Sequence, residues 1–278
     1  MHHMRLATVP FVNALPLLWG FRRGPYRDIA SIEEIPPSGI PARLRAGTID
    51  LGLVPVIEVQ RWSELEILPH LCIAAKRRAR SVLLVSRVPV DRIRSVALDE
   101  NSRTSAALLR ILLEHRGVRG VVYHEAAPSL RAMLRDHDAA LLIGDPALRA
   151  DTAGLEVLDL GGEWHAATGL PFVFAVWAIR PGATLTDGLR PFLDSRQMGL
   201  ANIATIARES AERIGSTPGA IEEYLRVNLH YHLGSEESRG LDLFFRQAHE
   251  LGLIPGLRRA LFHETGEREP ARAAREGA

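Results

Sequence analysis

Several polar side chains of this sequence lie where predicted strands end. Asn13 interrupts the apolar run VPFVNALPLLWGF (residues 9–21), NSRTS (101–105) follows the strand-like SVALD, and Gly144-Asp145 follows AALLI. In open α/β sheets, ligands bind outside the carboxyl ends of the strands. The order of these segments therefore predicts one cleft, to which several strand ends contribute hydrogen-bonding groups.

The segment NSRTS contains the residues best suited to hold an anion. Ser102, Arg103, Thr104 and Ser105 stand directly before or at the start of a predicted helix over 104–116. Hydroxyls, a guanidinium and the free N–H groups at a helix start together bind carboxylates well. The alternative is that Ser102 or Thr104 only caps the helix. Capping and ligand binding can also coexist.

The remaining candidates have equally simple structural explanations. Asp145 precedes a proline, as helix-capping aspartates often do, and Asn13 could cap the helix that follows it. Ser81 opens a predicted strand and is unremarkable on its own, while Thr168 and Gly169 precede the last strand. An amide such as that of Asn13 nevertheless supplies both a donor and an acceptor without adding charge.

Composition indicates an ordinary globular protein. The 278 residues are 46% hydrophobic, and 34 Lys and Arg balance 33 Asp and Glu. A net charge of +1 gives no general reason to expect nucleic acid or an anionic membrane as a partner. The single cysteine, Cys72, lies in an apolar run, where we expect it to be buried.

Several familiar signals are missing from the sequence. No apolar run approaches the roughly 20 residues of a membrane helix, and the first residues do not form a secretory signal, so we expect a cytoplasmic protein. There is no phosphate-binding loop, dinucleotide fingerprint, zinc-binding HExxH or GxSxG elbow. If the protein is an enzyme, we expect it to work without a metal or a nucleotide cofactor.

The elements that must position these residues alternate between strands and helices, which predicts an α/β fold with parallel sheets. Beyond about residue 187 the pattern predicts helices, over 199–215, 219–233 and 239–254, and from Glu264 the tail is polar. We interpret two strands as connections between two lobes. Lobe one then comprises 1–90 plus 178–278, and lobe two is inserted as 91–177. The predicted strands lie at 5–9, 49–55, 81–86, 95–99, 139–145 and 172–179, of which 81–86 and 172–179 are the connections.

Six segments together resemble the MqnA family, the chorismate dehydratases of the futalosine route to menaquinone. They are PFVNALPLLWGF, IPARLRAGTIDLGLVPVIEVQR, SVLLVSRVP, ALDENSRTSAALLRILL, DAALLIGDPAL and DLGGEWHAATGLPFVFAVWA, in consistent order over roughly residues 5 to 255. The resemblance implies a periplasmic-binding-protein-like type II fold, with two α/β lobes and a two-strand hinge. It also implies conversion of chorismate to 3-[(1-carboxyvinyl)oxy]benzoate and water, without a cofactor.

The resemblance also implies roles for individual residues of the cleft. Its reacting groups would be Asn13, Ser81 and Asp145, and its substrate-binding groups Ser102, Arg103, Thr104, Ser105, Gly144, Thr168 and Gly169. No histidine or glutamate stands out as the base. Either Asp145 or the side-chain carboxylate of chorismate could therefore take the proton.

Two other functions are compatible with the same fold. One is an MqnD-type lyase that acts on cyclic dehypoxanthine futalosine, and the other is a solute-binding protein that binds its ligand without chemistry. In each case the partner is a small molecule. The sequence does not determine the oligomeric state.

Overall fold

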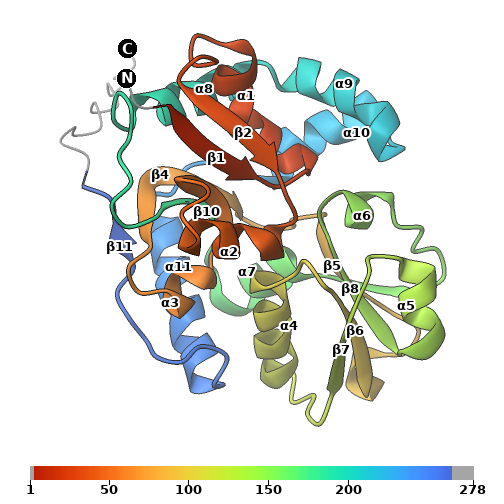
Figure 1. Cartoon of the computed structure of the whole chain (residues 1–278). Coiled ribbons are helices and arrows are strands. Elements are labelled where there is room, and N and C mark those ends of the chain that lie inside the picture. Colours follow the sequence, from red (N-terminus) through yellow and green to blue (C-terminus); the bar gives the residue numbers. More distant parts are fainter. Residues whose placement is uncertain (1–2, 265–278) are drawn as a thin grey trace, which may run out of the picture.

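The computed structural model describes residues 3–264, which form two β-sheets with helices packed around them (Figure 1). All but the first residue of the polar tail from Glu264 lies outside the described residues. The first sheet has the order β11 (Leu261–Phe262), β4 (Glu66–Ala75), β10 (Phe172–Ile179), β3 (Leu51–Pro55), β1 (Met4–Thr8) and β2 (Ala30–Glu34). The second has the order β7 (Val122–Ala126), β6 (Ser95–Asp99), β8 (Ala139–Ile143), β5 (Val82–Ser86) and β9 (Glu156–Asp159).

The two connections between the sheets lie side by side. Strand β4 ends at Ala75, which pairs with Phe172, the first residue of β10. The chain therefore leaves the first sheet and returns to it at neighbouring positions. Strand β5, which we placed with the first 90 residues, pairs within the second sheet, and β10 belongs wholly to the first. The predicted boundaries at residues 90 and 178 thus lie beyond the two changes of sheet.

Both sheets are mixed, whereas the pattern predicted parallel ones. Strand β10 runs antiparallel to β3 and β4, and β5 runs antiparallel to β8 and β9. These are the strands that follow the two connections. The other strand pairs of residues 3–264, such as β1 with β3 and β6 with β8, are parallel. Their carboxyl ends consequently face the space between the lobes.

Helix α1 (Leu15–Arg23) is held closely against α8 (Arg190–Ala201) in the first lobe (Figure 1). The Ser195 hydroxyl accepts from the Gly20 N–H at 2.9 Å and donates to the Leu17 carbonyl at 2.8 Å. A Cβ atom on Gly199 would lie 1.9 Å from the carbonyl oxygen of Pro16. Only glycine therefore allows this approach, which fixes the first turn of α1, two residues beyond Asn13.

Helices also pack around the second sheet, and they make up most of the C-terminal part of the chain. The helix predicted over 104–116 is α4 (Thr104–His115), and the one predicted over 239–254 is α11 (Ser235–Glu250). The helix expected over 219–233 is shorter. It consists of α10 (Pro218–Glu223) and a π-helical turn (Tyr224–Asn228), after which His230 pairs with Ala74 of β4. The remaining helices are α2 (Ile40–Arg45), α3 (Glu58–Arg61), α5 (Leu130–Asp136), α6 (Gly144–Arg149), α7 (Leu160–Thr168) and α9 (Ile203–Ile214).

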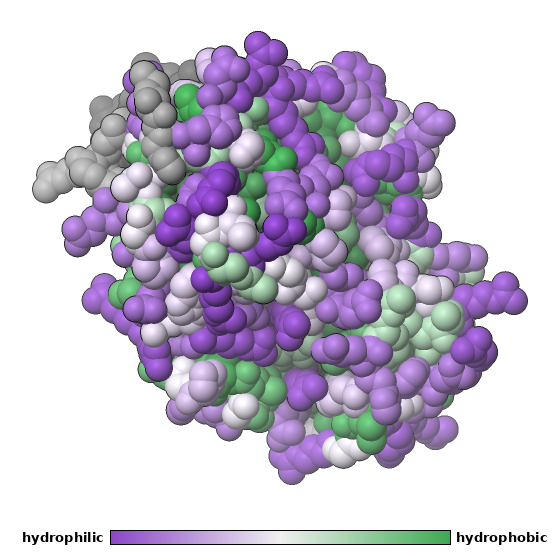
Figure 2. Space-filling view, in the orientation of Figure 1, coloured by the Kyte–Doolittle hydropathy of each residue, from purple (hydrophilic) through white to green (hydrophobic). Residues whose placement is uncertain are grey.

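The core consists of apolar side chains between the sheets and their helices. Trp164, Trp177, Phe172 and Phe244 are among the largest fully buried side chains, and Cys72 is buried as expected. The face shown in Figure 2 is mainly hydrophilic, with apolar side chains in small groups. None of the helices in residues 3–264 is long and apolar enough to cross a membrane.

Candidate active site

A partly open cavity lies between the two sheets and is lined from both of them. Apolar side chains such as Val9, Phe11 and Phe174 form much of its wall. Its polar side chains are Asn13, Ser81, Asn101, Ser102, Thr104 and Ser105. Among the described residues that line it, only Arg103 carries a charge. The site therefore combines neutral hydrogen-bonding groups with one cation.

Asn13 lies on a single 3-10 turn (Val12–Ala14) between β1 and α1. Neither this turn nor α1 has a side-chain cap, so the alternative that Asn13 caps the helix is wrong. Its Oδ1 atom is buried and has no hydrogen-bond partner. An unpaired buried acceptor costs about 1–3 kcal/mol. A ligand that donates a hydrogen bond to Oδ1 would remove that cost.

The segment 101–105 reaches the cavity at the start of α4. The N-cap residue is Arg103 and no side chain caps the helix, so the capping roles considered for Ser102 and Thr104 are both wrong. The Ser102 hydroxyl is buried without a partner. Thr104 Oγ1 accepts from the Ile57 N–H at 3.3 Å, which ties this helix start to the first lobe. The first N–H groups of α4 have no partner within the helix and remain available to an anion.

Ser81 is placed by a strained turn in the connection between the sheets. Arg80 adopts a left-handed conformation with φ of 60°, which is uncommon for a residue other than glycine. The Asp159 carboxylate holds this turn, because it accepts from the N–H groups of Ala79 at 2.8 Å and Arg80 at 2.7 Å. Ser81 follows directly and lines the cavity.

Tyr224, which our sequence reasoning missed, contacts Ser81 from the π-helical turn. Its hydroxyl donates to the Ser81 Oγ at 2.8 Å, and the tyrosine is fully buried. Burial raises the pKa of Tyr224 well above its usual value. The tyrosine is therefore a neutral phenol at physiological pH. π-Helical turns are frequent at functional sites.

Gly144 is needed where the two lobes meet. Its φ is +61°, and a Cβ atom there would lie 2.7 Å from the ring of Phe11. Its N–H donates to the Ser81 carbonyl at 2.8 Å. The absence of a side chain thus lets Phe11 close one wall of the cavity.

Asp145 is buried beside the cavity but does not line it. One carboxylate oxygen accepts from the Val12 N–H at 3.0 Å, and the other accepts from Arg213 at 2.8 Å. The residue before α6 is Ile143, so Asp145 is not the N-cap we considered. Both oxygens are engaged in holding the turn that carries Asn13.

Thr168 and Gly169 end helix α7 and are not part of the cavity lining. The Thr168 hydroxyl donates to the Trp164 carbonyl at 2.8 Å and accepts from the Leu170 N–H at 3.1 Å. Gly169 has a φ of +71° and forms the left-handed C-cap. The structure therefore does not bring these two predicted residues to the site, and it gives them a capping role.

Comparisons with solved structures establish the fold. A protein from Archaeoglobus fulgidus matches with a TM-score of 0.73 and 16% identity, over 91% of this chain and 99% of that one. The periplasmic aliphatic sulphonate binding protein SsuA from Escherichia coli matches with a TM-score of 0.64 and 17% identity, over 100% of this chain and 98% of that one. The predicted periplasmic-binding-protein-like fold is confirmed.

Sequence comparisons place the chain more narrowly. A chorismate dehydratase from Thermus thermophilus is 32% identical over 265 residues, which cover 87% of this chain and 93% of that protein. The model of a family described as menaquinone biosynthesis matches residues 4–250. The resemblance to the MqnA family is thereby confirmed, and the chain belongs to this family of menaquinone biosynthesis proteins.

Proposed function

We propose that this protein is a chorismate dehydratase, a hydro-lyase that forms 3-[(1-carboxyvinyl)oxy]benzoate and water. One observation supports this most directly: a cleft lined by neutral hydrogen-bonding groups, with Arg103 as its only charge among the described lining residues. Chorismate carries two carboxylates, so protein carboxylates in the cleft would repel it. The name of the Thermus thermophilus relative agrees with this substrate.

The binding mode follows from the two kinds of polar group. The start of α4, with Arg103 and Ser102, suits the ring carboxylate because a helix start and a guanidinium both favour an anion. Asn13 presents an unpaired oxygen acceptor, which suits a hydroxyl donor better than a carboxylate. We therefore assign Asn13 to the departing C4 hydroxyl.

The reaction removes the C3 proton and the C4 hydroxyl from the substrate. The electron pair of the C3–H bond enters the ring, the C4–O bond breaks, and the proton and hydroxide leave as water. Negative charge that develops after proton loss is conjugated with the ring carboxylate. Preorganised donors near the leaving oxygen would stabilise its charge, and Ser81 lies in the cavity wall.

The structure bears on the identity of the base. Both oxygens of Asp145 accept hydrogen bonds, from Val12 and Arg213, and Asp145 does not line the cavity. Of the two bases considered, the geometry favours the carboxyvinyl carboxylate of chorismate itself. It is attached through oxygen to C3, so it lies near the proton that is removed.

The test is a parallel assay of chorismate and cyclic dehypoxanthine futalosine with the purified protein. We expect chorismate to be consumed with equal formation of the aromatic product, identified by its mass and ultraviolet spectrum, and the futalosine derivative to remain unchanged. Turnover of the futalosine derivative alone would indicate the lyase. Saturable binding of chorismate without product would indicate a solute-binding protein.

The cytoplasmic location and the lobe boundaries at 90 and 178 stay predictions.

A further inference from the structure

The contact between Tyr224 and Ser81 joins distant parts of the chain at the wall of the cavity. Tyr224 belongs to the π-helical turn near the C-terminal end, whereas Ser81 lies in the connection between β4 and β5. The hydroxyl oxygens are 2.8 Å apart, and the tyrosine is fully buried while the serine is 3% exposed. Water therefore has little access to either group.

The direction of this hydrogen bond determines what Ser81 can do. A serine hydroxyl has one proton and two acceptor lone pairs. Since Tyr224 donates to the Ser81 oxygen, the serine proton remains available to another acceptor. Ser81 lines the cavity, so a bound molecule can be that acceptor.

Asn13 completes the arrangement from the turn between β1 and α1. Its side chain also contacts Tyr224, and because Oδ1 has no hydrogen-bond partner, this contact is made by the amide N–H₂ as donor. The amide oxygen is left free for a ligand. One phenol thereby engages the amide N–H₂ of Asn13 and the oxygen of Ser81, and leaves an acceptor and a donor to face the ligand.

We infer that Tyr224 is a positioning residue that orients the Ser81 hydroxyl proton and the Asn13 amide oxygen toward the substrate. The expected change in kcat rests on the proposed dehydration. The expected orientation of the Ser81 side chain rests on the contacts alone. Tyr224 does not line the cavity, so it acts through the two residues that do.

A buried tyrosine hydroxyl does not by itself require a partner in this protein. Tyr231 lies seven residues further along, is 3% exposed, and its hydroxyl has no hydrogen-bond partner. Tyr231→Phe is therefore a matched control for Tyr224→Phe, because both remove one buried hydroxyl from the same region. Only Tyr224 contacts residues of the cavity wall through that hydroxyl.

The kinetic experiment compares both variants with the wild type on chorismate. Tyr224→Phe should lower kcat about tenfold with KM nearly unchanged, which corresponds to one hydrogen bond of orientation. Tyr231→Phe should retain wild-type kcat. Ser81→Ala should lower kcat further, and Ser81→Ala with Tyr224→Phe should lose less than the two single losses combined, because Tyr224 acts partly through Ser81. Equal kcat values for Tyr224→Phe and the wild type, or additive losses in the double variant, would overturn the inference.

A second measurement needs no substrate and separates this inference from the proposed function. Crystal structures of the wild type and of Tyr224→Phe should differ in the Ser81 side chain, which we expect in one rotamer in the former and in several in the latter. If the wild type fails to convert chorismate, the proposed dehydration is wrong, and the rotamers still decide the role of Tyr224. An unchanged single rotamer in Tyr224→Phe would contradict it.

Discussion

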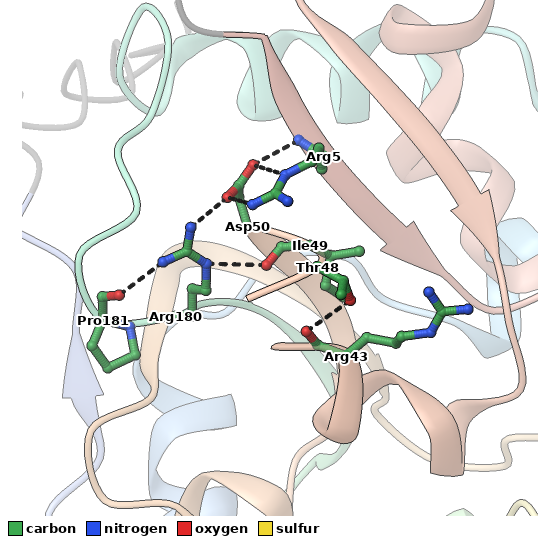
Figure 3. A network of polar contacts seen from close by, with 7 residues as sticks. All are labelled: Arg5, Arg43, Thr48, Ile49, Asp50, Arg180 and Pro181. Carbon is green, nitrogen blue, oxygen red and sulfur yellow. Dashed lines mark hydrogen bonds and ion pairs between the residues drawn. The ribbon is translucent and has the colours of Figure 1, made fainter. Parts of the chain in front are cut away.

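Buried polar groups are paired at one end of the first sheet and partly unpaired at the other. At the end away from the cavity, Asp50 precedes β3 and is surrounded by arginines (Figure 3). Its carboxylate accepts from the backbone N–H of Arg5 at 2.9 Å, from Arg5 Nη2 at 2.7 Å and from Arg180 Nη2 at 2.8 Å. This cluster joins β1, β3 and β10 through charge.

At the cavity, β1 of the first sheet and β6 of the second lead to neutral groups with unused hydrogen-bonding capacity. Asn13 Oδ1 and Ser102 Oγ are buried and have no partner. A buried atom without a hydrogen-bond partner does not by itself indicate a ligand site, since Trp177 Nε1 in the core also has no partner. The two cavity atoms differ because they belong to residues that line an open space. Satisfied charge at one end indicates stability, and unsatisfied neutral groups beside a cavity indicate a ligand.

The largest expected effect on stability comes from Asp50. Burial by itself would raise the pKa of this carboxyl, but hydrogen bonds from Arg5 and Arg180 hold it well below its usual range. Asp50→Ala removes a buried carboxylate that accepts from two partly exposed arginines, and should lower the free energy of unfolding by about 2 kcal/mol, the scale of hydrogen bonds to a charged group. Urea denaturation at neutral pH measures this loss. The exposed pair Arg23–Glu209 provides the control, because Glu209→Ala should cost less than about 1 kcal/mol.

Acid titration tests whether charge causes the effect. The pKa of Asp50 is lowered in the folded state, so its stabilisation is complete above the unfolded pKa of about 3.9 and is lost as pH falls toward the folded value. The difference in stability between wild type and Asp50→Ala should therefore shrink below about pH 4. A difference that stayed constant with pH would indicate lost packing instead of lost charge.

The next largest effect concerns Asn13 and should appear in catalysis. Asn13→Ala removes the acceptor assigned to the departing hydroxyl, and should lower kcat about 10²-fold, on the scale of losing one preorganised group. Because Asn13 caps no helix, the melting temperature should change little. Steady-state kinetics and thermal melts separate the two quantities. Near-normal turnover in a folded Asn13→Ala protein would show that the amide does not act on the reacting groups.

The same contrast explains which parts of the site could be predicted from the sequence. Polar residues at strand ends were found because the carboxyl ends of parallel strands share one edge, and Asn13 and residues 102–105 do line one cavity. Ser81 also lines it, but it precedes a strand, and its role in the cleft was predicted only through the family resemblance. Thr168 and Gly169 likewise precede a strand, and in the structure they end a helix. Helix ends and ligand sites use the same residue types, and the chain path that distinguishes them depends on tertiary packing.

Tyr224 shows what local patterns miss. It lies in a segment expected as an ordinary helix, and its contact with Ser81 spans 143 positions in the sequence. The pattern also missed β4, although its run of apolar residues (EILPHLCIAA) is the longest strand of the first sheet. His70 interrupts this strand with a φ of 65°, which breaks the regular alternation that marks a strand.

A smaller effect is expected at Arg103. Its side chain is exposed and lines the cavity, so it can bind a carboxylate present in both the ground state and the transition state. Arg103→Ala should raise KM about tenfold and leave kcat nearly unchanged. Arg110→Ala is a suitable control. Arg110 lies on helix α4, which begins directly after Arg103, but its side chain stacks on Tyr123 of β7 and does not line the cavity. A KM that rises equally in both variants would indicate general attraction of anions instead of a direct contact.

The smallest effect should come from Asp145, the residue whose sequence position made it a possible base. Asp145→Asn keeps an oxygen that can accept from the Val12 N–H, and it loses only the charge that pairs with the half-exposed Arg213. We therefore expect kcat to fall less than about fivefold, whereas the loss of a general base costs about 10²–10⁴-fold. Initial rates with saturating chorismate distinguish these ranges. A fall of 10²-fold or more without loss of folding would place the base on the protein. A small change would support the substrate carboxylate as the proton acceptor.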